Sequence, residues 1–115
     1  MRKPAKKKLL RIDRRVAIRM LRDLETMVVS LDRIGSAHAD NPRACDRATL
    51  AFIHDWGIFR KLASIRAGLG DLFSRKLGTD GMDELERELQ DVPYWTERQP
   101  TPPRKYAKGK AIRRR

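Results

Sequence analysis

The amino-acid sequence predicts an all-α protein, a small helical bundle of about four helices, two long and two short, with extended basic arms at both ends. Three observations lead to this fold class. Apolar residues recur at the three- and four-residue spacing of helices through most of the chain. Charged residues make up 37% of the 115 residues and aromatic residues 6%, a composition that favours helices over a β-sandwich. No segment has a convincing strand pattern.

The first long helix is expected from Leu9 to Ile34. Its apolar residues follow 4,3,4,3 spacing, which places them on one face at about 100° per residue. This face is expected to pack inside the bundle, and Gly35 is expected to end the helix. The stripe consists of Ala17, Leu21, Leu24, Val28 and Leu31, with Val16, Met20, Met27 and Ile34 beside it.

A row of arginines lies roughly opposite this apolar stripe, within an arc of about 80°. The row continues the positive charge of the N-terminal arm along the helix, so it is a candidate phosphate-binding surface. The alternative interpretation is a solvated outer face, on which Asp23, Glu25 and Asp32 partner some of the arginines. The row comprises Arg11, Arg15, Arg19, Arg22 and Arg33.

The second long helix is expected from about Pro42 to Ala67. Asp40 or Asn41 can cap its start, and Pro42 suits the first helical position. Gly57 weakens such a helix by up to about 1 kcal/mol relative to alanine, or it allows the close approach of another helix. The apolar face of this helix is Ala44, Cys45, Ala48, Ala51, Phe52, Trp56, Ile58, Phe59, Leu62 and Ala63.

Two short helices are expected in the second half of the chain. The third helix begins near Asp71 and ends at Gly78. The fourth begins at Thr79 or Asp80, is strongly acidic, and is stopped by Pro93. Its inward face consists of Met82, Leu85 and Leu89, continued by Val92.

The segment after the fourth helix combines aromatic residues with prolines. Tyr94 and Trp95 are expected to pin the chain back onto the helical body. From Gln99 onward, three prolines predict an extended spacer that leads into the basic C-terminal tail.

The net charge of +12 is concentrated at the two ends of the chain. Residues 1–11 carry six lysines and arginines and no acid, and residues 98–115 carry eight and no acid. The stretch 12–97 holds 13 basic and 15 acidic residues. The sequence therefore predicts a near-neutral helical domain, 12–97, between a basic N-terminal arm and a proline-containing basic C-terminal arm. Such charge blocks are typical of interaction tails with anionic partners.

No motif indicates catalysis or a cofactor. His38 and His54 accompany no recognisable nucleophile, and no glycine-rich phosphate loop is present. The single cysteine, Cys45, excludes an intrachain disulfide and a multi-cysteine metal site. The acidic residues of 80–91 lack the ligand spacing of known calcium loops. We therefore expect a protein that is not an enzyme and holds no metal.

The expected location is intracellular, cytoplasmic or nucleoid-associated, with no membrane partner. No uncharged apolar run approaches the roughly 18–20 residues that span a bilayer. The basic N-terminus lacks the apolar region of a signal peptide, because Arg11, Asp13 and the arginines that follow interrupt it.

These observations favour a non-enzymatic, nucleic-acid-binding small subunit of a larger RNA- or DNA-containing assembly, which packs on other protein subunits or on its own copies. Its charge layout resembles that of ribosomal proteins with arms in RNA and of small helical subunits of CRISPR effector complexes, without a shared motif. The alternative is a phage- or plasmid-type regulator or inhibitor that binds a protein partner through its helical surface. The candidate nucleic-acid-binding residues are Lys6, Lys7, Lys8, Arg11, Arg15, Arg19, Arg22, Arg104, Lys105, Tyr106, Lys108, Lys110, Arg113, Arg114 and Arg115.

Overall fold

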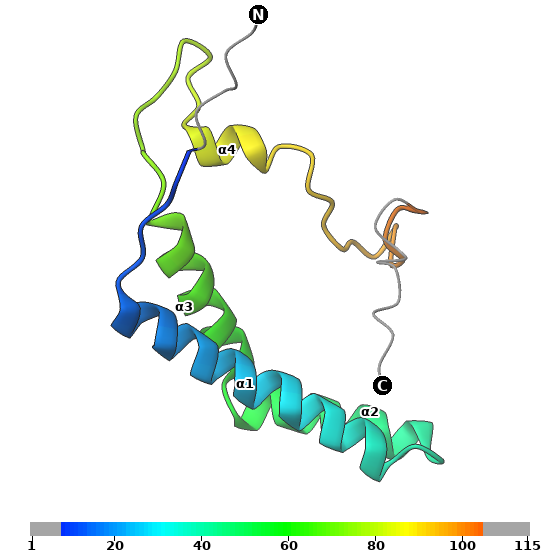
Figure 1. Cartoon of the computed structure of the whole chain (residues 1–115). Coiled ribbons are helices and arrows are strands. Elements are labelled where there is room, and N and C mark those ends of the chain that lie inside the picture. Colours follow the sequence, from blue (N-terminus) through cyan, green and yellow to red (C-terminus); the bar gives the residue numbers. More distant parts are fainter. Residues whose placement is uncertain (1–7, 105–115) are drawn as a thin grey trace, which may run out of the picture. The chain divides into compact units, whose positions relative to one another are not determined.

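The protein is all-α, as the sequence predicts. The computed structural model describes residues 8–104, in which four helices form (Figure 1). Within these residues no strand forms, and an isolated β-bridge joins Thr96 to Gln99. The helices are α1 (Arg14–Ala37), α2 (Pro42–Asp55), α3 (Ile58–Gly70) and α4 (Glu84–Glu88).

The chain divides into two compact units, of which the first ends at Ser74 and the second begins at Arg75. The first unit contains α1, α2 and α3, and the second contains α4 and the proline-rich segment. The division into two arms and a domain at residues 11 and 98 stays a prediction.

Helix α1 begins five residues later than expected and ends three residues later. Asp13 caps its start, because its carboxylate accepts a hydrogen bond of 2.9 Å from the Arg15 N–H. The helix continues through Gly35, which has no side chain or backbone within 4 Å of the position of a Cβ. It ends where the His38 N–H donates to the Ile34 carbonyl, at 3.1 Å. The prediction that Gly35 stops the helix is therefore wrong.

The expected second long helix is broken into two at Gly57. Of the two residues expected as possible caps, Asn41 caps α2: its side chain accepts a hydrogen bond of 3.1 Å from the Ala44 N–H, with Pro42 at the first helical position. Gly57 then adopts φ 60° and ψ 41°, a left-handed conformation that ends α2 and starts α3 in a new direction. Nothing lies within 4 Å of a Cβ built at Gly57. Glycine therefore suits this position because the backbone is left-handed, and the close approach of another helix is not the reason.

The three helices of the first unit form a hairpin in two layers. Figure 1 shows α2 returning along the second half of α1 and α3 lying beside its first half. The close approach of α1 and α3 occurs at Gly68, where an added Cβ would collide with the Met20 Cε methyl. The core cluster consists of Met20, Met27, Phe52, Ile58 and Ile65, with Val16 and Ile34 packed against it.

The predicted apolar stripe of α1 is not the face that this core buries. Met20 and Met27 are 8% and 5% exposed, whereas Leu21 is 59% exposed and Val28 63%. The helices α2 and α3 cover only one edge of a broad apolar surface, because a two-layer hairpin gives each helix a single covered side. The same limit leaves Trp56, Phe59 and Leu62 exposed on the other layer, against expectation.

The second unit contains less helix than the sequence predicts. No helix forms between Asp71 and Gly78, and the fourth helix is only five residues long. Asp83 and Glu86 form a capping box that starts α4: the Asp83 side chain accepts from the Glu86 N–H at 2.8 Å, and the Glu86 side chain accepts from the Asp83 N–H at 3.4 Å. The residues before Asp83 form a tight turn instead of a helix, in which Gly81 has φ 79°.

Candidate nucleic-acid interface

The structure describes six of the fifteen predicted binding residues. Lys6, Lys7, Lys105, Tyr106, Lys108, Lys110, Arg113, Arg114 and Arg115 lie outside the described residues. Lys8 and Arg11 lie in the non-helical segment before α1, and Arg104 closes the described part of the second unit. The remaining three, Arg15, Arg19 and Arg22, lie on α1.

Arg15, Arg19 and Arg22 form one exposed row on the first three turns of α1. Their spacing of four and three residues places them on one face, and Arg33 returns to this face near the end of the helix. By the helical repeat of about 100° per residue, the row points well away from the buried edge that Met20 and Met27 define. Four members of the predicted row therefore lie on the surface of α1, whereas the fifth, Arg11, precedes the helix, so its predicted place on the helical face is wrong.

The guanidinium groups of this row are not engaged by neighbouring acids. Within residues 8–104, no ion pair or side-chain hydrogen bond holds Arg15, Arg19 or Arg22. The Arg15 and Arg22 contacts that do form use the backbone: the Arg15 N–H donates to the capping Asp13 carboxylate, and the Arg22 carbonyl accepts from Thr26 Oγ1 at 3.2 Å. An arginine row without carboxylate partners keeps all its N–H donors available for phosphate oxygens.

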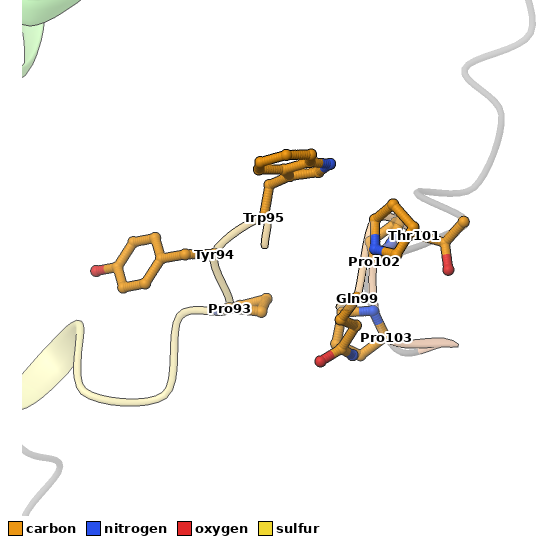
Figure 2. Close-up of a pocket in the computed structure, with 8 residues that line it drawn as sticks. Pro93, Tyr94, Trp95, Gln99, Thr101, Pro102 and Pro103 are labelled. Carbon is orange, nitrogen blue, oxygen red and sulfur yellow. The ribbon is translucent and has the colours of Figure 1, made fainter. Parts of the chain in front are cut away.

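The second unit places two exposed aromatic rings beside a hollow. The hollow has a volume of about 120 Å³, and Figure 2 shows the Tyr94 ring projecting away from Gln99 and the prolines that follow. The Gln99 N–H donates to the Thr96 carbonyl and to Thr96 Oγ1, both at 3.1 Å, and this turn folds the chain back on itself. The hollow is lined by Pro93, Tyr94, Trp95, Gln99, Pro100, Thr101, Pro102 and Pro103.

Sequence reasoning missed these two rings as candidate binding residues. Tyr94 is 77% exposed and Trp95 68%, so the expectation that they pin the chain onto a helical body is wrong. Exposed rings next to arginine are typical of surfaces that stack on nucleic-acid bases. Arg98 lies in the same turn and is exposed as well. The signal in the sequence was the position of the aromatic pair directly before the basic tail.

One acidic residue of the second unit, Asp80, is held in an ion pair within that unit. Asp80 binds Arg87 through two hydrogen bonds, from Nε at 2.9 Å and from an Nη at 3.0 Å, and the same Nη donates to the Met82 carbonyl. These hydrogen bonds hold the pKa of the Asp80 carboxyl well below its ordinary value of 3.8, and the Met82 N–H adds to the effect. The same pair raises the pKa of Arg87.

The described part of the chain shows no metal-binding arrangement around its cysteine or its acidic residues. Cys45 is half-buried on α2, where its carbonyl accepts a hydrogen bond of 2.8 Å from Thr49 Oγ1. Across residues 8–104, no three His, Cys, Asp or Glu side chains lie close enough together to hold a metal ion.

Comparison with known protein families, with curated proteins and with solved structures gives no match for this chain. None of the helices in the described residues is long and apolar enough to cross a membrane.

Proposed function

We propose that the protein binds nucleic acid through phosphate contacts, as a small subunit of a larger RNA- or DNA-containing assembly. The observation that carries this proposal is the row of Arg15, Arg19 and Arg22, exposed on α1 and free of carboxylate partners in the described chain. Guanidinium groups pair with phosphate oxygens in a bidentate geometry, so such a row suits a polyphosphate backbone.

The distribution of charge supports the same proposal. The residues before α1 include Lys8 and Arg11, and the sequence carries four further basic residues ahead of them. The arginine row and this basic segment follow one another in the chain, so a phosphate backbone bound by one is within reach of the other. Phosphate contacts of this kind give affinity and position but little sequence specificity.

The exposed aromatic pair adds a preference for unpaired bases. Tyr94 and Trp95 provide flat apolar surfaces next to Arg98, a combination that suits stacking on bases of a single strand. In a duplex the faces of the bases are already stacked, so these rings have less to bind. The proposed ligand is therefore RNA or DNA with single-stranded segments.

The test is a salt titration of the full chain with three substitutions that each remove one positive charge. Arg15→Gln, Arg19→Gln and Arg22→Gln together should reduce the slope of log K against log salt by about 2–3, because each phosphate contact contributes slightly less than 1. The matched control is Arg43→Gln, Arg47→Gln and Arg60→Gln, three exposed arginines on α2 and α3 that remove the same charge. Equal slopes for the two triple variants would refute a specific role for the α1 row.

A second function, a regulator that binds a protein partner, has one observation in its favour. The apolar stripe of α1 is exposed at Leu21, Val28 and Leu31, and such surfaces are typical of protein contacts. The titration separates the two functions, since a pure protein-binding regulator would show no affinity for oligonucleotides at low salt.

A further inference from the structure

The apolar stripe of α1 has the spacing of a helix-pairing seam, and within the first unit neither α2 nor α3 covers it. Ala17, Leu21, Leu24, Val28 and Leu31 alternate at four and three residues, which is the a/d pattern of paired helices. The adjacent edge, with Met20 and Met27, is already packed against α2 and α3. The helix therefore presents two neighbouring apolar edges, of which the hairpin uses one.

We propose that this seam pairs with α1 of a second copy of the chain, antiparallel and about a two-fold axis. The length of the seam argues for this occupant: from Ala17 to Leu31 it spans roughly 21 Å. Among the described helices only α1, with 24 residues, can present a matching stripe of that length. Helices α2 and α3, with 14 and 13 residues, already pack on α1, and α4 has five.

The charge along α1 favours the antiparallel arrangement. Residues 11–22 contain five arginines and one aspartate, whereas residues 23–37 contain three acids and one arginine. An antiparallel pair brings the basic half of each helix beside the acidic half of the other. A parallel pair would place like charges together, which costs free energy and disfavours that orientation.

The exposed apolar surface extends from the seam onto the second layer of the hairpin. In a pair of antiparallel helices, residues that are rotated away from the buried face in the same direction along each helix lie on the same side of the pair. The seam on α1, Trp56 and Phe59 are all rotated in this same direction from the buried residues of their helices. Trp56 and Phe59 therefore lie on the side of the seam. Aromatic side chains each bury about 150–250 Å². With the seam residues they supply much of the roughly 800 Å² per partner that a stable interface takes.

The dimer has a consequence for nucleic-acid binding, and this step rests on the proposed function. The arginine row lies about 160° around α1 from the centre of the seam. Pairing through the seam therefore turns the two rows outward on opposite sides of the dimer. A dimer of this kind can hold two nucleic-acid segments at once, one on each outer face.

The oligomeric state of the full chain tests the dimer without nucleic acid. Sedimentation velocity at high salt should give twice the chain mass of 13.4 kDa. Leu21→Glu should reduce the mass to that of the monomer, because it places a charge in the seam. The matched control is Leu50→Glu, since Leu50 is 57% exposed against 59% for Leu21 but lies on the outward side of α2; this variant should remain dimeric. Circular dichroism of both variants checks that the helices persist.

Three outcomes would overturn the dimer: a monomeric wild-type chain, an open-ended series of larger species, or an equal effect of the two variants. A monomer would leave the seam to the chain's own second unit or to a different protein. Should Leu21→Glu fail to fold, Val28→Glu provides the same test, since Val28 is 63% exposed.

Spin-label distances decide the orientation independently of mass. With Cys45 replaced by alanine, single labels at residues 15 and 26 lie on the same face of α1. In an antiparallel pair centred on Leu24, the two labels at residue 15 lie roughly 27 Å apart along the helix axis and those at residue 26 roughly 6 Å. Equal distances at the two positions would show a parallel pair and refute the proposal.

Bridging is measured by co-capture of two oligonucleotides, one immobilised and one fluorescent. Wild type and Leu50→Glu should retain the fluorescent strand, and Leu21→Glu should lose it while still binding one strand. If the dimer forms but neither strand binds, the proposed function fails and the dimer stands. If single strands bind but the chain is a monomer, the dimer fails and the proposed function stands.

Discussion

At the scale of single residues, the Asp80–Arg87 pair shows how side chains organise the second unit where periodicity fails. The bidentate contact joins the turn before α4 to the helix itself. Gly78 lies beside it, and a Cβ there would come within 2.7 Å of an Arg87 Nη, so a larger residue would displace the guanidinium group. The Gly78 N–H also donates to the Met82 carbonyl at 2.8 Å. An ion pair therefore closes a turn in a region that the acidic pattern alone suggests is helix.

This pair predicts a pH dependence with a definite sign. Since the folded-state pKa of Asp80 is lowered, its stabilising contribution is complete above the ordinary value of 3.8 and declines as the pH falls below it toward the folded-state pKa. Asp80 should remain ionised at pH values where an unperturbed aspartate is protonated. Carboxyl chemical shifts followed by NMR against pH measure this directly.

The control for this titration is Arg87→Gln, which removes the charge and the paired hydrogen bonds. In this variant the Asp80 carboxyl should titrate closer to its ordinary pKa. A wild-type Asp80 that already titrates near 3.8 would contradict the geometry of the pair.

Trp95 carries the second prediction at this scale. Stacking of one base on an aromatic ring contributes about 1–3 kcal/mol, so Trp95→Ala should weaken binding of a single-stranded oligonucleotide by about fivefold to 150-fold. Trp95→Phe keeps an aromatic face and should retain most of the affinity. Fluorescence anisotropy with a labelled oligonucleotide measures both, and an unchanged affinity for Trp95→Ala would remove this ring from the interface.

At the scale of helices, sequence periodicity shows where a helix forms better than it shows which face of the helix is buried. The helical periodicity of α1 and the Pro42 start of α2 are local signals, and the structure confirms a helix at each place. Which apolar edge of α1 is buried depends on where α2 and α3 lie. The 4,3,4,3 stripe and the edge with Met20 and Met27 are adjacent, so periodicity alone cannot choose between them.

The break at Gly57 was not predictable for a related reason. A glycine in an apolar helical pattern can lie within a continuous helix, can allow the close approach of another helix, or can form a left-handed turn. Only the backbone of the folded chain distinguishes these three. Because a continuous helix would have one buried face, the predicted core included Phe59 and Leu62 and did not include Ile65. The turn re-aims α3 so that Ile58 and Ile65 reach the core.

Substitutions of two glycines test whether the left-handed conformation of Gly57 separates α2 from α3. Gly57→Ala should lower the free energy of unfolding by about 1 kcal/mol, because alanine resists the left-handed conformation. Gly35→Ala is the matched control: Gly35 lies inside α1 with open space around it, so alanine should raise stability by about 0.5–1 kcal/mol. Urea denaturation at one protein concentration gives both values. A stabilising effect of Gly57→Ala would contradict the left-handed turn.

At the scale of the whole chain, charge and apolar surface are segregated. The basic residues gather toward the two ends of the sequence and in a row on α1, and the exposed apolar stripe of α1 lies away from that row. The sequence predicted the row from its spacing. It left open whether Asp23, Glu25 and Asp32 partner the arginines, because side-chain pairing depends on rotamers and neighbouring helices. The described structure leaves the row without acidic partners.

The most direct test of the proposed phosphate binding is an equilibrium titration of the full chain with single-stranded and duplex oligonucleotides across a range of salt concentrations. If about 6–8 basic side chains contact phosphate, the slope of log K against log salt should be about −5 to −7 on duplex DNA and somewhat shallower on a single strand. A chain that fails to bind either oligonucleotide at low salt, or binds with a slope near zero, would contradict the account.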